Sequence, residues 1–330
     1  MSEIWIWPAF IAFIFAMIAA DLLIFHREAH EVTIKEALIW SVIWTVIGLS
    51  FTGVIYLWHG GTAAGEYVAG YVIERSLSVD NIFVFAIIFS YFQVPAKYQH
   101  GVLLWGIIGA VVFRIIFIAV GASLLETFHW MIFVFGGFLV FTGVRMGLSK
   151  EVDVDPEKNA ALKMLRRVIP LTTDYRGASF FVRENARLMA TPLLAVLLVI
   201  ETTDIIFAVD SIPAIFAVTD DSFIVFSSNA FAILGMRVLY FLLADMMHRF
   251  IYLKQGLAVV LVFVGVKMLT EDVFHLSIWL SLGFIALVLV SCILISLFAT
   301  RNDPPEHAAV HGGHEDEPES TVAASKEEGA

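Results

Sequence analysis

The sequence predicts an all-α, polytopic membrane protein with about nine transmembrane helices, and two observations carry this prediction. Of the 330 residues, 59% are hydrophobic and 15% are charged, and the mean hydropathy is +0.86. A soluble domain of this length needs more charge to cover its surface. Stretches of roughly 18 or more mostly apolar residues, long enough to cross the hydrocarbon layer, also recur along the chain.

The expected spans are, in order, Trp5–Phe25, Glu36–Trp58, Glu66–Phe92, His100–Leu125, Trp130–Leu148, Ala190–Val218, Ser222–Met247, Gln255–Leu269 and Ser277–Ala299. They divide the chain into two N-terminal transmembrane helices (1–65), a first three-helix repeat (66–148), a cytoplasmic loop (149–189), a second three-helix repeat (190–270), a last transmembrane helix (271–300) and an acidic cytoplasmic tail (301–330). The tail is rich in Pro, Glu and Ala, a composition that cannot bury a core, so we expect it to be disordered.

Lysine and arginine alternate between the links and predict the orientation. The first, third, fifth and seventh links contain them, with eight in the long link after the fifth span, whereas the four even-numbered links contain none. Under the positive-inside rule, the N-terminus lies outside the cell and the C-terminus lies in the cytoplasm.

The chain contains an internal repeat. Val79-Asp80-Asn81-Ile82 is echoed 130 residues later by Val209-Asp210-Ser211-Ile212, and Leu139–Met146 is echoed 122 residues later by Leu261–Met268. The arginines Arg114 and Arg237 end a third matching stretch, 123 residues apart. Because each copy has three spans, consecutive copies enter the membrane from opposite sides, which predicts the inverted repeats of many secondary transporters. A scaffold without flux could inherit the same duplication.

Ionisable and amide side chains in the predicted membrane interior form the candidate site. Those expected as metal ligands are Glu74, Asp80, Asn81, Glu201, Asp204 and Asp210. Those expected to support them or balance their charge are Arg75, Arg114, Arg237, Ser211, Asn229 and Asp21. A charged side chain at the bilayer centre costs roughly 2.5–3.5 kcal/mol, so these groups must face each other, a basic partner, an ion or water.

Helical geometry indicates which of these side chains can meet. Glu74 and Asn81 are seven residues apart and therefore lie on nearly one face, as do Asp204 and Ser211. At 100° per residue, Asp80 lies about 120° around the helix axis from Glu74. Its repeat equivalent, Asp210, lies at the same angle from Asp204.

Local unwinding near Pro213, which removes a backbone donor one turn after Asp210, could bring all the acids to one cavity. The alternative is that the acids pair with the three central arginines and serve only helix packing. Five acids against three arginines leave a surplus of two, which favours a bound cation or protons. Carboxylate, amide and hydroxyl oxygens suit Mg²⁺, Ca²⁺ or Mn²⁺. With no mid-span histidine, and a single cysteine in the last span, Zn²⁺ and Cu⁺ are disfavoured.

The same stretches resemble the signature motifs of the TerC family. The matching segments are Glu74–Asn81, Ile205–Val218, Asn229–Arg237 and Phe181–Arg183, within a resemblance that extends from about Trp5 to Ala299. The chain is most similar to the Alx-type, alkali-inducible members. The resemblance implies a bacterial inner-membrane protein linked to Mn²⁺ export or homeostasis, with some relatives named for tellurium resistance.

The leading functional hypothesis is an inner-membrane Mn²⁺ exporter, with proton coupling as an open possibility. The alternatives are a scaffold or metallation factor that delivers metal to exported proteins, and a tellurium-resistance-associated membrane protein without flux. We expect no enzyme, because no nucleophile–base pair or HExxH motif is present. We also expect no tightly bound cofactor. The expected partners are Mn²⁺, with Ca²⁺ or Mg²⁺ as alternatives, protons and the lipid bilayer; nucleic acid is excluded by the lack of a dense basic stretch, and protein partners stay unspecified.

Overall fold

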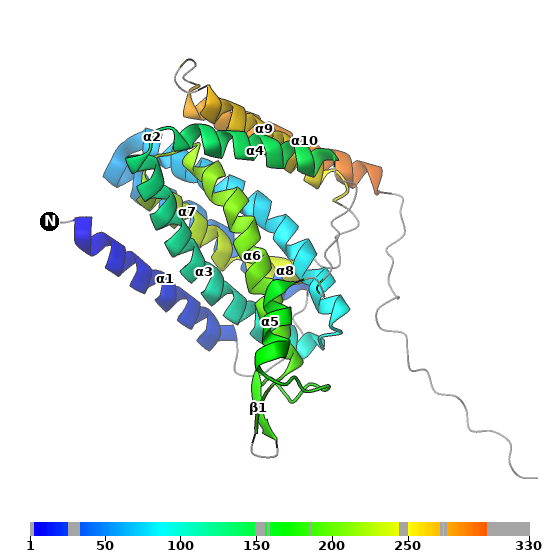
Figure 1. Cartoon of the computed structure of the whole chain (residues 1–330). Helices are drawn as coiled ribbons and strands as arrows, with labels where there is room; N and C mark the ends of the chain where they lie inside the picture. The colour runs from blue at the N-terminus through cyan, green and yellow to red at the C-terminus, as the bar shows by residue number, and fades with distance from the viewer. Residues whose placement is uncertain are drawn as a thin grey trace, which may run out of the picture.

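A computed structural model of the whole chain describes residues 3–25, 34–148, 156, 159–184, 187–243, 250–270, 273 and 276–301. Its helices are α1 (Glu3–Phe25), α2 (Ile34–Tyr91), α3 (Ala96–Thr127), α4 (Met131–Leu148), α5 (Ala160–Val168), α6 (Pro192–Phe216), α7 (Ser222–Leu234), α8 (Met236–Leu243), α9 (Leu253–Leu269) and α10 (Ile278–Ala299). They form one bundle in which α4, α9 and α10 lie together along one side (Figure 1). The predicted tail lies, beyond Arg301, outside the described residues.

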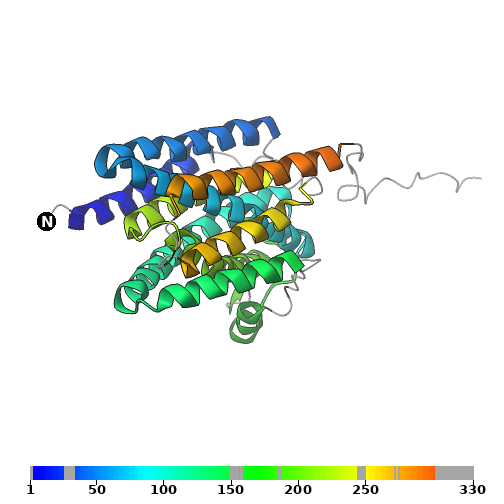
Figure 2. The ribbon, with the colours of Figure 1, turned by 90° about the horizontal axis from the view of Figure 1, so that it is seen from above.

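Helix α2 contains two of the predicted spans. Its 58 residues are interrupted at Gly60, whose φ of 84° and ψ of −174° bend the chain sharply between two helical arms. Figure 2 shows the two arms as neighbouring helices that run back along one another. A positive φ of this kind suits glycine, which has no Cβ to clash with the backbone. The second and third spans are therefore joined by a single break, not by the loop expected at residues 59–65.

The polytopic, helical membrane fold is confirmed. Among the described residues, five helices are long and apolar enough to cross a membrane, and the bent pair α7 and α8 makes a sixth if it is one span. With two predicted spans in α2, and with α1 and α9, the described helices cover all nine predicted positions. The number nine itself stays a prediction, since length and composition alone qualify five described helices, or six with the bent pair.

The third helices of the two repeats, α4 and α9, pack closely through glycine. A Cβ added at Gly143 would lie 2.9 Å from the carbonyl oxygen of Ala258, and one added at Gly265 would lie 2.8 Å from that of Gly136. These are the same contact under the repeat offset of 122 residues, because Gly143 corresponds to Gly265 and Gly136 to Ala258. Since the contact partners run in opposite directions along the two helices, α4 and α9 are antiparallel, as inverted repeats require.

The loop between the repeats contains the part of the fold that the sequence did not predict. Strands β1 (Phe181–Glu184) and β2 (Arg187–Ala190) form an antiparallel hairpin, with Phe181 opposite Ala190. The sixth predicted span therefore begins as a helix only at Pro192, after the strand ends and Thr191 occupies the N-cap position. Before the hairpin, Asn159 accepts hydrogen bonds from the backbone of Ala161 and Leu162 and starts the short helix α5.

Candidate functional site

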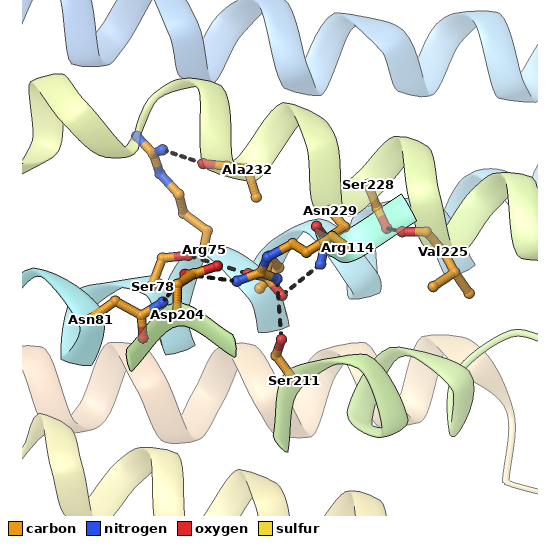
Figure 3. Close-up of polar contacts among 11 residues, drawn as sticks. Arg75, Ser78, Asn81, Arg114, Asp204, Ser211, Val225, Ser228, Asn229 and Ala232 are labelled. Carbon is orange, nitrogen blue, oxygen red and sulfur yellow. Dashed lines mark hydrogen bonds and ion pairs between the residues drawn. The ribbon is translucent and has the colours of Figure 1, made fainter. Parts of the chain in front are cut away.

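A buried guanidinium lies at the centre of the candidate site. Arg114 of α3 has a side chain only 1% exposed, and its Nη1 lies 2.6 Å from Oε1 of Glu74 on α2. Its Nη2 lies 3.4 Å from Oδ1 of Asp204 on α6. Glu74 and Asp204 occupy equivalent positions in the two repeats, 130 residues apart. One arginine therefore joins the matching carboxylates of both copies (Figure 3).

Amide and hydroxyl groups complete the contacts around this arginine. Asn81 donates from Nδ2 to Oδ1 of Asp204 at 3.3 Å, so the first repeat contacts the carboxylate of the second. Asn229 of α7 donates to Oε2 of Glu74 at 3.0 Å. The Ser211 hydroxyl accepts from Arg114 Nη1 at 3.2 Å. These side chains come from α2, α3, α6 and α7 and point toward one another (Figure 3). The faces predicted from seven-residue spacings are thus brought together.

The sequence prediction missed one member of the cluster. Ser78, fully buried one turn after Glu74, donates from its hydroxyl to Oε1 of that carboxylate at 3.4 Å. The spacing of four residues on a helix is a signal that could have identified it, because side chains at that spacing lie on one face.

The cluster has a surplus of oxygen acceptors. Oδ2 of Asp204 and Oδ1 of Asn229 are buried, and neither has a hydrogen-bond partner in the described residues. Two carboxylates also face one guanidinium, so ionised acids leave one negative charge here. Burying an oxygen without a partner is unfavourable, and burying an unbalanced charge is more so. The arrangement therefore favours a further positive group, either a metal cation or a proton.

Asp80 and Asp210 are not brought to this cluster. Lys254 of α9 acts electrostatically on Asp80, and Arg145 of α4 acts on Asp210, so both acids face the α4–α9 pair. The helical offset of about 120° explains this separation. No unwinding is observed at Pro213, since α6 is continuous to Phe216. The proline stands in the last turn, where losing one backbone hydrogen bond does not break the helix.

Glu201 lies one turn before Asp204 on α6, also against α3, and its carboxylate interacts electrostatically with that of Asp204. Its carboxylate presses on the backbone of Gly109 so closely that a Cβ at that position would collide with it. Its Oε2 atom is buried and has no hydrogen-bond partner in the described residues. Gly109 is therefore needed for Glu201 to occupy this place between the two helices.

The other predicted arginines bind elsewhere. Arg75 donates from Nη1 to the carbonyl of Ala232 at 2.9 Å and so caps the end of α7. Arg237 forms an ion pair with Asp21 of α1, with 2.5 Å between Nη2 and Oδ2 and side chains 2% and 7% exposed. In the part of the chain that the structure describes, no three or more His, Cys, Asp or Glu side chains are grouped to hold a metal ion. The described site is thus a two-carboxylate site closed by Arg114.

A larger cavity of about 210 Å³ opens at the ends of α3 and α6 that we predict to lie outside the cell. Glu126, His129 and Asp220 line it together with apolar residues such as Ala122. Nearby, Thr219 donates a hydrogen bond to Glu66 at 2.7 Å. The sequence analysis did not single out these residues, because they stand at span ends, where polar groups are ordinary.

Comparison with known proteins gives matches to membrane proteins over most of the chain. Residues 59–304 match the model of the integral membrane protein TerC family. An uncharacterized membrane protein of Myxococcus xanthus is 50% identical over 304 residues, which cover 92% of this chain and 95% of the relative. A putative membrane-bound redox modulator, Alx, of Escherichia coli K12 is 46% identical over 309 residues, or 90% of this chain and 96% of the relative. The Alx protein of Photorhabdus laumondii is 41% identical, covering 92% and 97%. No solved structure matches.

Proposed function

Because the chain belongs to the TerC family of integral membrane proteins, we propose that it exports a divalent cation, Mn²⁺ by preference, across the bacterial inner membrane through the Glu74–Asp204 site. The predicted family and its Alx-type members are confirmed by the same matches. The observation that carries the proposal is the pair of buried, equivalent carboxylates from two inverted repeats, joined by one arginine. Secondary transporters place their substrate at such a repeat interface.

The donor atoms support the cation class. Glu74 and Asp204 supply carboxylate oxygens, Asn229 supplies an amide oxygen without a hydrogen-bond partner in the described residues, and Ser211 supplies a hydroxyl. Mn²⁺, Mg²⁺ and Ca²⁺ take such hard oxygen ligands. A divalent cation would balance the two carboxylates fully, and Arg114 would have to withdraw as it binds. Arg114 and the cation are therefore competitors for the same oxygens.

Proton coupling fits the same competition. When the cation leaves, the carboxylates need a new positive partner because the site is buried. Arg114 satisfies Glu74 closely but meets Asp204 only at 3.4 Å, so a proton on the second carboxylate is the natural complement. Glu201, Asp80 and Asp210 are then candidates to contact the cation before or after it occupies the central site.

The name of the Alx relatives, redox modulator, belongs to those proteins. This chain has a single cysteine, Cys292, and cannot form an intrachain disulfide. Any redox effect would therefore use chemistry other than an intrachain disulfide. A metal-delivering scaffold remains the alternative that must be separated by experiment.

The test is Mn²⁺ flux through purified protein in liposomes. Wild type, Glu74→Gln, Asp204→Asn and the control Glu184→Gln are compared. Glu184 lies on the loop hairpin, where it pairs with Arg176 and both side chains are exposed. We expect wild type and the control to transport and both site variants to fall to background. Equal flux in all four would overturn the proposal. Saturable Mn²⁺ binding without flux in wild type would support the scaffold instead.

A further inference from the structure

Arg114 and Arg237 are repeat equivalents with different partners. They stand 123 residues apart, at the end of matching stretches in the middle helices of the two copies. Arg114 binds Glu74 and Asp204, whereas Arg237 binds Asp21. Asp21 belongs to α1, which lies outside both repeats and has no counterpart in the internal duplication. Equivalent arginines of the two copies thus lie in two different environments.

The segment that holds Arg237 is interrupted. Helix α7 ends at Leu234, Gly235 follows, and α8 starts at Met236 with its axis bent by 43°. There is no room for a Cβ at Gly235, because the Arg75 guanidinium that caps α7 lies against it. Discontinuous helices of this kind form the substrate and ion sites of many secondary transporters. Arg237 is the second residue of the separate half, α8.

A small cavity connects Arg237 with the central site. Its volume is about 10 Å³, and both Asp204 and Arg237 line it, with apolar residues from α2, α3 and α6. Gly106 also lines it and is the repeat equivalent of Asn229, which stands 123 residues later. Asn229 satisfies an oxygen of Glu74, but Gly106 has no side chain to satisfy Asp204. This asymmetry explains why Oδ2 of Asp204 has no hydrogen-bond partner in the described residues.

We propose that Arg237 is an alternating partner of the site carboxylates, and that Asp21 is the positioning residue that holds it in the state described here. The inference rests on the proposed transport function. Transporters built from inverted repeats change access when one repeat moves against the other. If the two copies exchange conformations, Arg237 takes the role of Arg114, crosses the small cavity and pairs with Asp204.

Electrostatics favours a transfer of Arg237 from Asp21 to Asp204 over a separation that leaves it with no carboxylate. Pulling Arg237 from Asp21 without a new partner would leave a buried, uncompensated charge, which is strongly unfavourable. Moving it to Asp204 keeps the guanidinium paired and supplies the acceptor oxygen with a donor. Asp21 stands near the end of α1 that we predict to be cytoplasmic, where opening of the inner side would hydrate it.

The experiment measures access to the outer cavity and does not depend on flux. Cys292→Ser removes the native cysteine, and Ala122→Cys places a reporter at the outer cavity. Intact cells are treated with a membrane-impermeant maleimide. In the described state the cavity is present, so the reporter labels. Asp21→Asn removes the carboxylate that holds Arg237 away from Asp204, so the labelling rate should fall about fivefold or more, the size of a typical coupling between two sites.

Two further variants separate the exchange from a merely structural ion pair. Adding Asp204→Asn to Asp21→Asn removes the new partner and should restore labelling, an effect that a structural role for Asp21 would not produce. Asp21→Glu keeps the charge and should label as wild type, and Glu184→Gln serves as the remote carboxylate control. Each variant is first required to purify as a monodisperse protein.

The outcomes distinguish the two proposals. Unchanged labelling in Asp21→Asn, or a fall that Asp204→Asn does not reverse, overturns the exchange of partners whether or not Mn²⁺ is transported. The expected labelling pattern without Mn²⁺ flux in wild type overturns the proposed function and retains the exchange. Mn²⁺ flux with the expected pattern supports both.

Discussion

Replacing Arg114 by glutamine removes the guanidinium that joins Glu74 to Asp204 while keeping a polar side chain at the centre of the site. Both carboxylates are almost fully buried, at 0% and 3% exposure, and their ion pairs to Arg114 are lost together. Removing one partner of a buried ion pair costs roughly 3–5 kcal/mol. We therefore expect the melting temperature of the Arg114→Gln variant in detergent to fall well below that of wild type when no divalent cation is present.

Mn²⁺ should restore the thermal stability that Arg114→Gln loses. In this variant Mn²⁺ no longer competes with the guanidinium for the oxygens of Glu74 and Asp204. A ligand at 100 times its dissociation constant stabilises the folded state by about 2.7 kcal/mol. The assay is thermal unfolding during a Mn²⁺ titration, with Glu184→Gln as the control that should follow wild type. The reasoning is refuted if Mn²⁺ stabilises Arg114→Gln no more than wild type, since Arg114 and the cation would then not share a site.

Three further substitutions test packing and surface charge in the rest of the fold. Gly109→Ala should displace Glu201 and lower the melting temperature, because the new Cβ meets its carboxylate; adding Glu201→Ser should recover part of the loss, and no recovery would contradict the contact. Gly265→Val should separate α4 from α9 and cost about 1–3 kcal/mol, measured by chemical unfolding, as in other overpacked interiors. An unchanged midpoint would argue against the close packing. Glu184→Gln breaks an ion pair whose side chains are 51% and 40% exposed, so unfolding should change by less than about 1 kcal/mol.

The central cluster was predictable because helical periodicity acts locally. The seven-residue spacings put Asn81 with Glu74 and Ser211 with Asp204, and the repeat suggested that these two faces meet. The separation of Asp80 from Glu74 follows from the same arithmetic. The sequence analysis expected unwinding near Pro213 to bring the separated acids back to one cavity. A proline in the last turn of a helix leaves the preceding residues helical, so this does not occur.

The partners of Arg237 and Arg75 could not be predicted in this way. The Asp21–Arg237 pair joins residues 216 positions apart, and its first member lies in a helix without a repeat equivalent. Arg75 binds the backbone carbonyl of Ala232, which is available because α7 ends at Leu234. No residue pattern predicted that the helix would end there. The loop hairpin was missed because its strands have only four residues each, too few for a clear alternation.

The glycine contact between α4 and α9 has a consequence for the ancestry of the chain. Because Gly143 meets Ala258 as Gly265 meets Gly136, the surface on each helix fits an antiparallel copy of itself. Such a self-complementary interface is the kind that joins identical subunits about a two-fold axis. A protein with a single three-helix unit could therefore assemble only from copies inserted in both directions. In the present chain one polypeptide supplies both orientations, and α1 contributes an aspartate to the second copy alone.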